Sequence, residues 1–184
     1  MVMLAADPDR RRAARLATVE EHVRLENAHD IEGIMTTFGT TARYDDEPWG
    51  HHCVGHDSVR AYYADLLRAV PDLFIDVQQR HITDTVVILE VIIRGHHMGV
   101  WRGLTATGRE LAVPLCGVFT FDNNDLLAGE RIYYDRASVL RQLGVFHEPD
   151  RIVGRLEIAL MHPLTIARAI RRMTRRYLTR CFTD

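Results

Sequence analysis

The sequence predicts one α+β domain in which N-terminal helices pack on a cone-shaped, curved antiparallel β-sheet around a blind pocket. Two observations support this fold class. Apolar residues recur at helical spacing up to about residue 70, and they alternate as in strands from Leu73 onward. Helices followed by a run of strands is the order of an α+β fold. The length of 184 residues, with 47% hydrophobic residues and a net charge of −2, suits a domain with a full core.

Three helices are expected before the main strands. The first begins near Pro8, capped by Asp7 or Asp9, and its apolar stripe ends near His29. A second, short helix over 31–38 ends at Gly39, and a strand is expected over 40–46. The third helix is introduced by Gly55 and Asp57, runs to about residue 69 and stops before Pro71.

Four long strands follow, joined in pairs by polar turns. They are expected over 74–82, 85–94, 109–121 and 126–135. A short helix over 136–143, closed by Gly144, completes the domain. We place this domain at residues 1–148.

Residues 149–184 form a separate helical extension that is rich in arginine. Residues 151–184 carry 8 arginines and 2 acids, whereas residues 1–150 carry 15 arginines and 23 acids. Pro163 divides the extension into an apolar stretch and a second stretch with the pattern of a basic amphipathic helix, and both are expected to be helical. They are open to three interpretations: packing on the domain or on a partner subunit, peripheral contact with an anionic membrane, and nucleic-acid binding. The acidic body disfavours nucleic acid, so we expect no nucleic-acid partner.

Composition removes several function classes. All 23 basic residues are arginine, so no lysine Schiff base can form. The two serines lie outside a G-x-S-x-G motif, and the common phosphate-binding loops are absent from the sequence. The three cysteines are far apart, which indicates neither a disulfide framework nor a metal site. No apolar run reaches the roughly 18 residues of a membrane span, and we expect a cytoplasmic protein.

The most informative segment runs from Gly95 to Arg109 and reads G-H-H-M-G-V-W-R-G-L-T-A-T-G-R. It is followed by G-E-R-I-Y-Y-D over 129–135 and by Q-L-G over 142–144. These linked segments resemble the SnoaL-like polyketide cyclase (ester cyclase) family of the nuclear-transport-factor-2-like superfamily. The resemblance covers about residues 10–145. His96 replaces the usual threonine and Ala106 the usual second proline, so the pocket rim is expected to differ.

The resemblance implies a cofactor-independent enzyme in which Asp135 acts as general acid and base. One carboxyl group in an apolar pocket can serve both roles, because burial raises its pKa toward the working pH. The alternative is that Asp135 only caps the helix that begins at Arg136. The resemblance also aligns His97 with a family histidine that could polarise a substrate carbonyl, although a histidine bonded within the sheet is an equal alternative.

Strand alternation places Arg131 and Tyr133 on the same face as Asp135, so they should share the pocket if Asp135 does. Tyr133 could donate to an enolate oxygen, and Arg131 could lower the pKa of Asp135 or bind a carboxylate. Either residue could instead simply pack. The expected substrate-binding side chains are Tyr133, Arg131, Trp101, Trp49, His52, Tyr62 and Tyr63, of which the aromatic ones would supply flat apolar walls.

The histidines His51, His52 and His56 do not have the spacing of a metal site, so we expect no metal, and His52 is placed at the pocket rim. The leading functional hypothesis is acid/base catalysis on a hydrophobic carbonyl compound, as a polyketide-type aldol cyclase or an isomerase. An epoxide hydrolase is the second, weakened because Glu90 and Arg94 stand in place of an R-x-D motif. A non-catalytic protein that binds a hydrophobic ligand is the third.

The relatives that share this fold commonly form homodimers through the outer face of the sheet. Alternating apolar residues over 111–121 leave one face of this strand to be covered besides the pocket. A homodimer is therefore expected.

Overall fold

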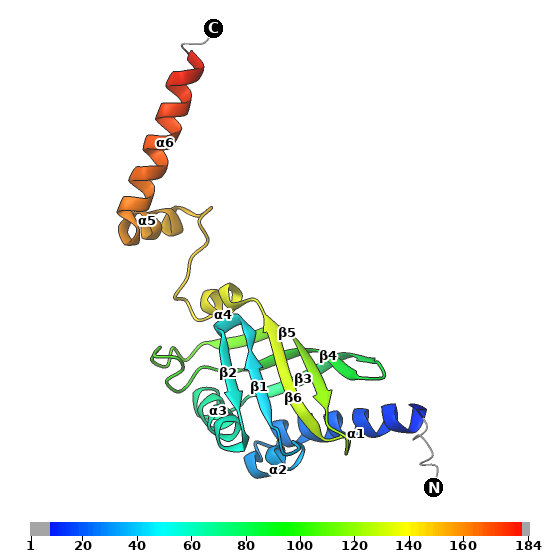
Figure 1. Ribbon diagram of the computed structural model, residues 1–184. Helices are drawn as coiled ribbons and strands as arrows, with labels where there is room; N and C mark the ends of the chain where they lie inside the picture. The colour runs from blue at the N-terminus through cyan, green and yellow to red at the C-terminus, as the bar shows by residue number, and fades with distance from the viewer. Residues whose placement is uncertain (1–7, 182–184) are drawn as a thin grey trace. The chain divides into compact units, whose positions relative to one another are not determined.

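The computed structural model describes residues 8–181, and its contacts divide the chain into two compact units, 1–143 and 144–184 (Figure 1). Within the described range, all of the strands lie in the first unit. Its elements are α1 (Pro8–Asn27), α2 (Ile31–Thr36), β1 (Arg43–Asp46), the 3-10 turn η1 (Glu47–Trp49), β2 (His51–Val54), α3 (His56–Ala69), β3 (Phe74–Ile82), β4 (Val86–His96), β5 (Glu110–Phe121), β6 (Leu127–Tyr134) and α4 (Arg136–Gln142). The predicted α+β class is confirmed.

The six strands form one open sheet in the order β2-β1-β6-β5-β4-β3. The prediction of a purely antiparallel sheet is wrong in one place, because β1 pairs with β6 in parallel, with Asp45 opposite Arg131. The other pairs are antiparallel. Register shifts interrupt β3 between Val77 and Gln79 and β5 next to Phe121, and such irregularities bend and twist a sheet. The strand β2 was not predicted.

The inner face of the sheet packs against α1, α2 and α3 and forms the core. On β5, the side chains Leu111, Val113, Leu115 and Phe119 are buried in this core. The alternating apolar residues of this strand therefore cover the inside of the sheet and are not available for a subunit contact. The outer face of β5 carries Pro114 and Cys116.

The loop after β4 is held against the end of α3 by backbone contacts. The amides of Met98 and Gly99 both donate to the carbonyl oxygen of Ala69, at 2.8 and 3.0 Å. A Cβ atom at position 99 would collide with the carbonyl oxygen of Arg68, so only glycine allows this approach. This contact places His97 at the inner face of the sheet.

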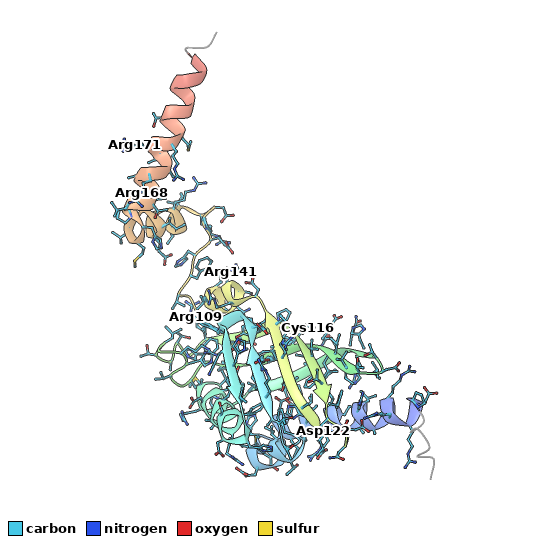
Figure 2. The ribbon with its side chains drawn as sticks, in the orientation of Figure 1. Arg109, Cys116, Asp122, Arg141, Arg168 and Arg171 are labelled. Carbon is cyan, nitrogen blue, oxygen red and sulfur yellow. The ribbon has the colours of Figure 1, made fainter. Side chains whose placement is uncertain are left out.

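The second unit consists of α5 (Ile152–Met161) and α6 (Pro163–Cys181). The helix α6 is an amphipathic helix whose polar face is arginine, and Figure 2 shows Arg168 and Arg171 projecting from it. Apolar side chains are exposed on both helices: Ile152, Val153, Leu156, Leu160, Met161, Leu164, Ile170 and Met173. Within residues 8–181, no helix has the length and apolar character to cross a bilayer.

Candidate functional site

An apolar cavity between the helices and the inner face of the sheet is the candidate site. It has two adjoining compartments, an inner and an outer one, that share part of their lining. The residues that line both compartments are Tyr44, Leu66, Leu73, Ile93, Leu115 and Ile132. The lining of both compartments is largely apolar, as it is in pockets that bind small organic ligands.

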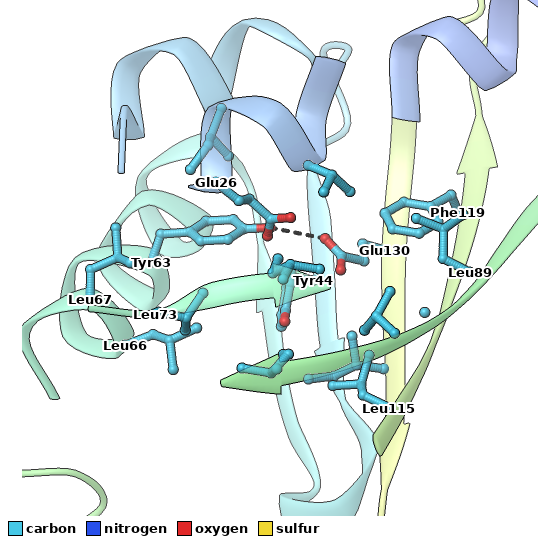
Figure 3. Close-up of a pocket in the computed structure, with 17 residues that line it drawn as sticks. Glu26, Tyr44, Tyr63, Leu66, Leu67, Leu73, Leu89, Leu115, Phe119 and Glu130 are labelled. Carbon is cyan, nitrogen blue, oxygen red and sulfur yellow. Dashed lines mark hydrogen bonds between the residues drawn. The ribbon is translucent and has the colours of Figure 1, made fainter. Parts of the chain in front are cut away.

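Two carboxyl groups, Glu26 from α1 and Glu130 from β6, line the inner compartment (Figure 3). His22 and Tyr63 lie beside them. The Tyr63 hydroxyl donates to Oε2 of Glu130 at 2.9 Å, and Nε2 of His22 lies 3.2 Å from the same oxygen and 3.6 Å from Oε1 of Glu26. As whole residues, all four are at most 7% exposed. We call these four residues the inner cluster.

Thr37 orients His22 within this cluster. The Thr37 hydroxyl donates to the carbonyl oxygen of Ile34 at 2.7 Å, so it accepts from Nδ1 of His22, also at 2.7 Å. The other ring nitrogen, Nε2, is thereby directed at the carboxyl groups.

Burial and mutual repulsion control the charges in the inner cluster. Burial raises the pKa of Glu130, and the nearby charge of Glu26 raises it further. Burial alone would lower the pKa of His22, but Glu26 and Glu130 more than offset this and raise the pKa to about 10. At neutral pH, His22 is therefore a buried cation beside two carboxyl groups.

In the outer compartment, His97 is fully buried, and its Nε2 has no hydrogen-bond partner among the residues that the structure describes. Nδ1 has two contacts: the Thr107 hydroxyl lies 3.1 Å away, and the backbone amide of Thr107 donates to Nδ1 at 3.3 Å. Because the amide can only donate, Nδ1 is assigned as the acceptor and the ring proton is assigned to Nε2. Burial lowers the pKa of His97, so the ring is neutral near pH 7. By hydrogen-bond geometry, Nε2 thus lies without a partner in an apolar lining, although the backbone of Gly99 opposes part of the pKa shift that burial causes.

A second polar group adjoins the outer compartment, centred on the fully buried Asp46 of β1. Its carboxylate accepts from Arg102 at 2.6 Å, from Tyr134 at 3.1 Å and from Tyr62 at 3.2 Å. The guanidinium of Arg102 also lies over the ring of Trp49. Because both oxygens of Asp46 accept hydrogen bonds from side chains, this buried carboxylate is held by structural partners.

Four of the side chains that the sequence suggested as site residues do line the cavity. Tyr63 lines the inner compartment, and His97, Tyr62 and Trp101 line the outer one. Trp49 does not line either compartment. Its ring packs edge to face on the ring of Trp101, with the two ring centroids 5.2 Å apart.

The expectation that Asp135, Tyr133 and Arg131 face the pocket is wrong. They do share one side of β6, but it is the outer side, because Glu130, Ile132 and Tyr134 of the same strand line the cavity. Tyr133 is 44% exposed and the Arg131 side chain is 49% exposed. Arg131 pairs there with Glu47 at 3.2 Å.

Asp135 caps α4, as the structural alternative expected. It accepts from the amide of Ala137 at 2.8 Å and pairs with Arg141 at 3.1 Å, and its side chain is 60% exposed. The pKa of Asp135 is lowered: desolvation acts to raise it, but the amide and arginine donors outweigh that effect. A lowered pKa is the opposite of what a carboxylic acid needs to hold its proton near pH 7.

His52 also lies away from the cavity. Its Nδ1 donates to Oδ1 of Asp45 at 2.8 Å, and its side chain is 45% exposed. The neighbouring His51 lies on the other side of β2, against the ring of Tyr62, as expected for adjacent residues of a strand.

Sequence reasoning missed His22, Glu26, Glu130 and Asp46. A signal was present in the first helix, because His22 and Glu26 stand within the apolar stripe that contains Val19 and Val23. Ionisable residues at these spacings share the buried face of the helix. Such residues are seldom buried without partners, so this stripe indicated a polar cluster inside the domain.

In the part of the chain that the structure describes, two groups of side chains have a composition that could hold a metal ion: His22, Glu26 and Glu130, and on the outer face Asp45, Glu47 and His52. In each group the potential ligand atoms lie within 4.8 Å of one another. In the inner cluster, however, Tyr63 and His22 already occupy Oε2 of Glu130.

Solved structures of similar fold include a SnoaL-like polyketide cyclase candidate from Jannaschia sp. CCS1, with 17% identity, a TM-score of 0.67, and coverage of 77% of this chain and 97% of that one. A protein of ketosteroid isomerase-like fold from Catenulispora acidiphila has 18% identity, a TM-score of 0.61, and coverage of 70% and 92%. SalBIII, an epoxide hydrolase/cyclase-like enzyme of salinomycin pyran-ring formation, has 17% identity, a TM-score of 0.59, and coverage of 67% and 92%. At these identities the likeness shows the fold. No curated protein matches the chain.

The family comparison covers the first unit. The model of the SnoaL-like polyketide cyclase family matches residues 16–143, which contain the six strands and both compartments of the cavity. The chain belongs to the SnoaL-like polyketide cyclase family.

Proposed function

We propose that the protein is an enzyme that uses acid/base chemistry, without a cofactor, on a hydrophobic carbonyl-bearing substrate bound in the cavity. Aldol-type cyclisation and isomerisation are the reactions that we favour. The observation that carries the proposal is the unpaired Nε2–H of His97 in an apolar compartment. A buried donor without a partner costs about 1–3 kcal/mol, and a substrate oxygen would recover this cost.

The neutral state of His97 suits this role. A neutral imidazole can donate to a carbonyl oxygen and stabilise the negative charge that develops there during enolisation. The aromatic rings of Tyr62 and Trp101 in the same compartment supply apolar surface for the rest of the substrate.

The first experiment compares a ketone with its hydrocarbon. Binding of 1-tetralone and of tetralin is measured for the wild type, for His97→Leu and for the control His81→Leu, which changes an exposed histidine on β3. The wild type and the control should bind the ketone about tenfold more tightly, and His97→Leu should lose this preference. Equal binding of the two compounds by the wild type would refute carbonyl recognition.

Turnover is tested with the same ketone. An enzyme that enolises carbonyl compounds should exchange the α-hydrogens of 1-tetralone in deuterium oxide, which proton NMR follows directly. The non-catalytic alternative predicts binding without any exchange above the buffer rate.

Epoxide opening is the second candidate, and the pair of Asp46 and Arg102 favours it, because an aspartate next to an arginine can activate water. It ranks second because the donors on both oxygens of Asp46 leave no oxygen ready to act as a base. Hydrolysis of styrene oxide that is lost in Asp46→Asn would reverse this order.

Three further expectations complete the proposal: a cytoplasmic protein, a homodimer, and peripheral contact of α6 with membranes. The exposed apolar and arginine side chains of the second unit support the last of these. The outer face of the sheet supports the dimer, because it has a groove lined by Ile92, Pro114 and Tyr133 among others.

A further inference from the structure

We propose that Glu130 is the proton-transferring residue of the cavity, with His22, Glu26 and Tyr63 as the residues that position and charge it. This inference rests on the proposed function and assigns its chemistry to the inner cluster. It replaces Asp135, which caps α4 on the outside of the sheet.

Glu130 is placed where a bound substrate would lie. Glu130 lines the inner compartment in the middle of β6, whose neighbouring inward residue Ile132 lines both compartments. Figure 3 shows the carboxyl groups of Glu26 and Glu130 and the hydroxyl of Tyr63 converging at one side of this compartment. A substrate that fills the apolar space would therefore have a carboxyl group beside its carbon skeleton.

The two oxygens of Glu130 differ in their hydrogen-bond partners. Among the described residues, the hydrogen-bonding partners of this carboxyl group, Tyr63 and His22, both meet Oε2. Oε1 is thus the atom left for a substrate. Donors on one oxygen fix the orientation of the carboxylate, and the other oxygen can take or return a proton.

The surroundings of Glu130 raise the pKa of its carboxyl group. A carboxylate in an apolar site is a stronger base than one in water, because burial and the neighbouring Glu26 both disfavour its charge. The titratable groups around Glu130 are His22 and Glu26 on α1, Tyr63 on α3 and Tyr44 on β1. Protonated His22 keeps this group of acids from becoming an uncompensated buried negative charge.

The chemical step follows from this geometry. Oε1 of Glu130 takes a proton from the carbon next to the substrate carbonyl, the C–H electron pair becomes the enolate, and Glu130 becomes a carboxylic acid. In an isomerisation, the same proton returns to a different carbon of the dienolate. In a cyclisation, the enolate carbon attacks a second carbonyl group, and the proton passes to the new alkoxide. Both sequences regenerate the carboxylate and need no oxidant or reductant.

The test is exchange of the α-hydrogens of 1-tetralone by purified full-length protein. Glu130→Gln should lower the exchange rate at least 100-fold while retaining ketone binding. Glu20→Gln, a matched change on the exposed face of α1, should stay within twofold of the wild type. Tyr63→Phe keeps the carboxyl group but removes its donor, and should lower the rate about tenfold.

A positioning role for His22 is read from the pH profile. His22→Gln removes the buried cation, so the pH at which exchange reaches half its maximum should move upward relative to the wild type. A change in rate with no change in this midpoint would refute the electrostatic role of His22.

The remaining outcomes separate the two proposals. Absence of exchange in the wild type overturns the proposed function, and this inference with it. Exchange by the wild type that persists in Glu130→Gln overturns this inference alone. A tight 1:1 complex with Co²⁺ that requires His22, Glu26 and Glu130 would also overturn it, by making the cluster a metal site.

Discussion

Tyr63 of α3 and Glu130 of β6 are joined by a 2.9 Å hydrogen bond inside the domain, although 67 residues separate them in the chain. The bond ties a helix to the centre of the sheet and holds one oxygen of a buried carboxyl group. Its removal should therefore affect both stability and chemistry.

Tyr63→Phe should lower the free energy of unfolding by about 1.5–3 kcal/mol, because a carboxyl group that loses its donor remains buried. Urea denaturation followed by circular dichroism measures this change. Thr18→Ala, which removes a hydroxyl on the partly buried side of α1 that bonds to the carbonyl of Asp125, provides a comparison for an uncharged acceptor. If Tyr63→Phe lowers the free energy of unfolding no more than Thr18→Ala does, the hydrogen bond to the buried carboxyl group contributes no more than one to an uncharged acceptor.

The buried His22 should make stability depend on pH. Its pKa in the folded protein is raised to about 10, above the value of about 6.5 for an unfolded chain. The stabilisation is therefore complete below pH 6.5 and is lost as the pH rises toward 10. The melting temperature of the wild type should fall steadily over this range, and that of His22→Gln should fall less. Parallel curves for the two proteins would contradict a raised pKa.

The same cluster marks the limit of what the sequence could reveal. Helical spacing predicts α1, but apolar periodicity alone does not distinguish the buried ionisable residues His22 and Glu26 from the exposed ones on the same helix. The buried role of Glu130 depends on which side of β6 faces the helices, and a shift of one residue reverses every side chain. The family resemblance implies that Asp135 faces the pocket. Strand alternation from Asp135 then predicts that Arg131 and Tyr133 face it as well. The parallel pairing of β1 with β6 joins residues 44–46 to 130–132, which no local pattern indicates.

Replacement of Asp135 should lower the stability of the fold, because Asp135 caps α4. Asp135→Ala removes the cap of α4 and should cost about 1 kcal/mol, whereas Asp135→Asn keeps a capping side chain and should cost a few tenths. Thermal denaturation of the two variants checks this order. A variant of normal stability that has lost the exchange of 1-tetralone would restore the catalytic role that the family resemblance implies.

The outer face of the sheet should be the dimer contact. Ile92 of β4 lies in the groove on this face, next to Pro114 and Tyr133. We expect light scattering to give twice the chain mass of 21.1 kDa, and Ile92→Glu to give the single-chain mass, because two buried carboxylates would then oppose each other. Ile82→Glu, at the end of β3, serves as the matched control and should remain dimeric. A wild type that is monomeric at tens of micromolar would refute the dimer.

The arginine-rich helix α6 should bind anionic membranes. Between Pro163 and Cys181 it contains six arginines and no acidic residue, and Leu164, Ile170 and Met173 are exposed on it. Each arginine near an anionic surface contributes about 1 kcal/mol, and the apolar side chains add to this when they enter the interface. The full-length protein should float with vesicles that contain phosphatidylserine and stay behind with pure phosphatidylcholine. Replacement of Arg168, Arg171 and Arg172 by glutamine should abolish flotation, whereas the same replacement at Arg10, Arg24 and Arg60 of the first unit should not. If the wild type floats with neither kind of vesicle, membrane binding is refuted, and the exposed side chains of α6 would instead contact another protein surface.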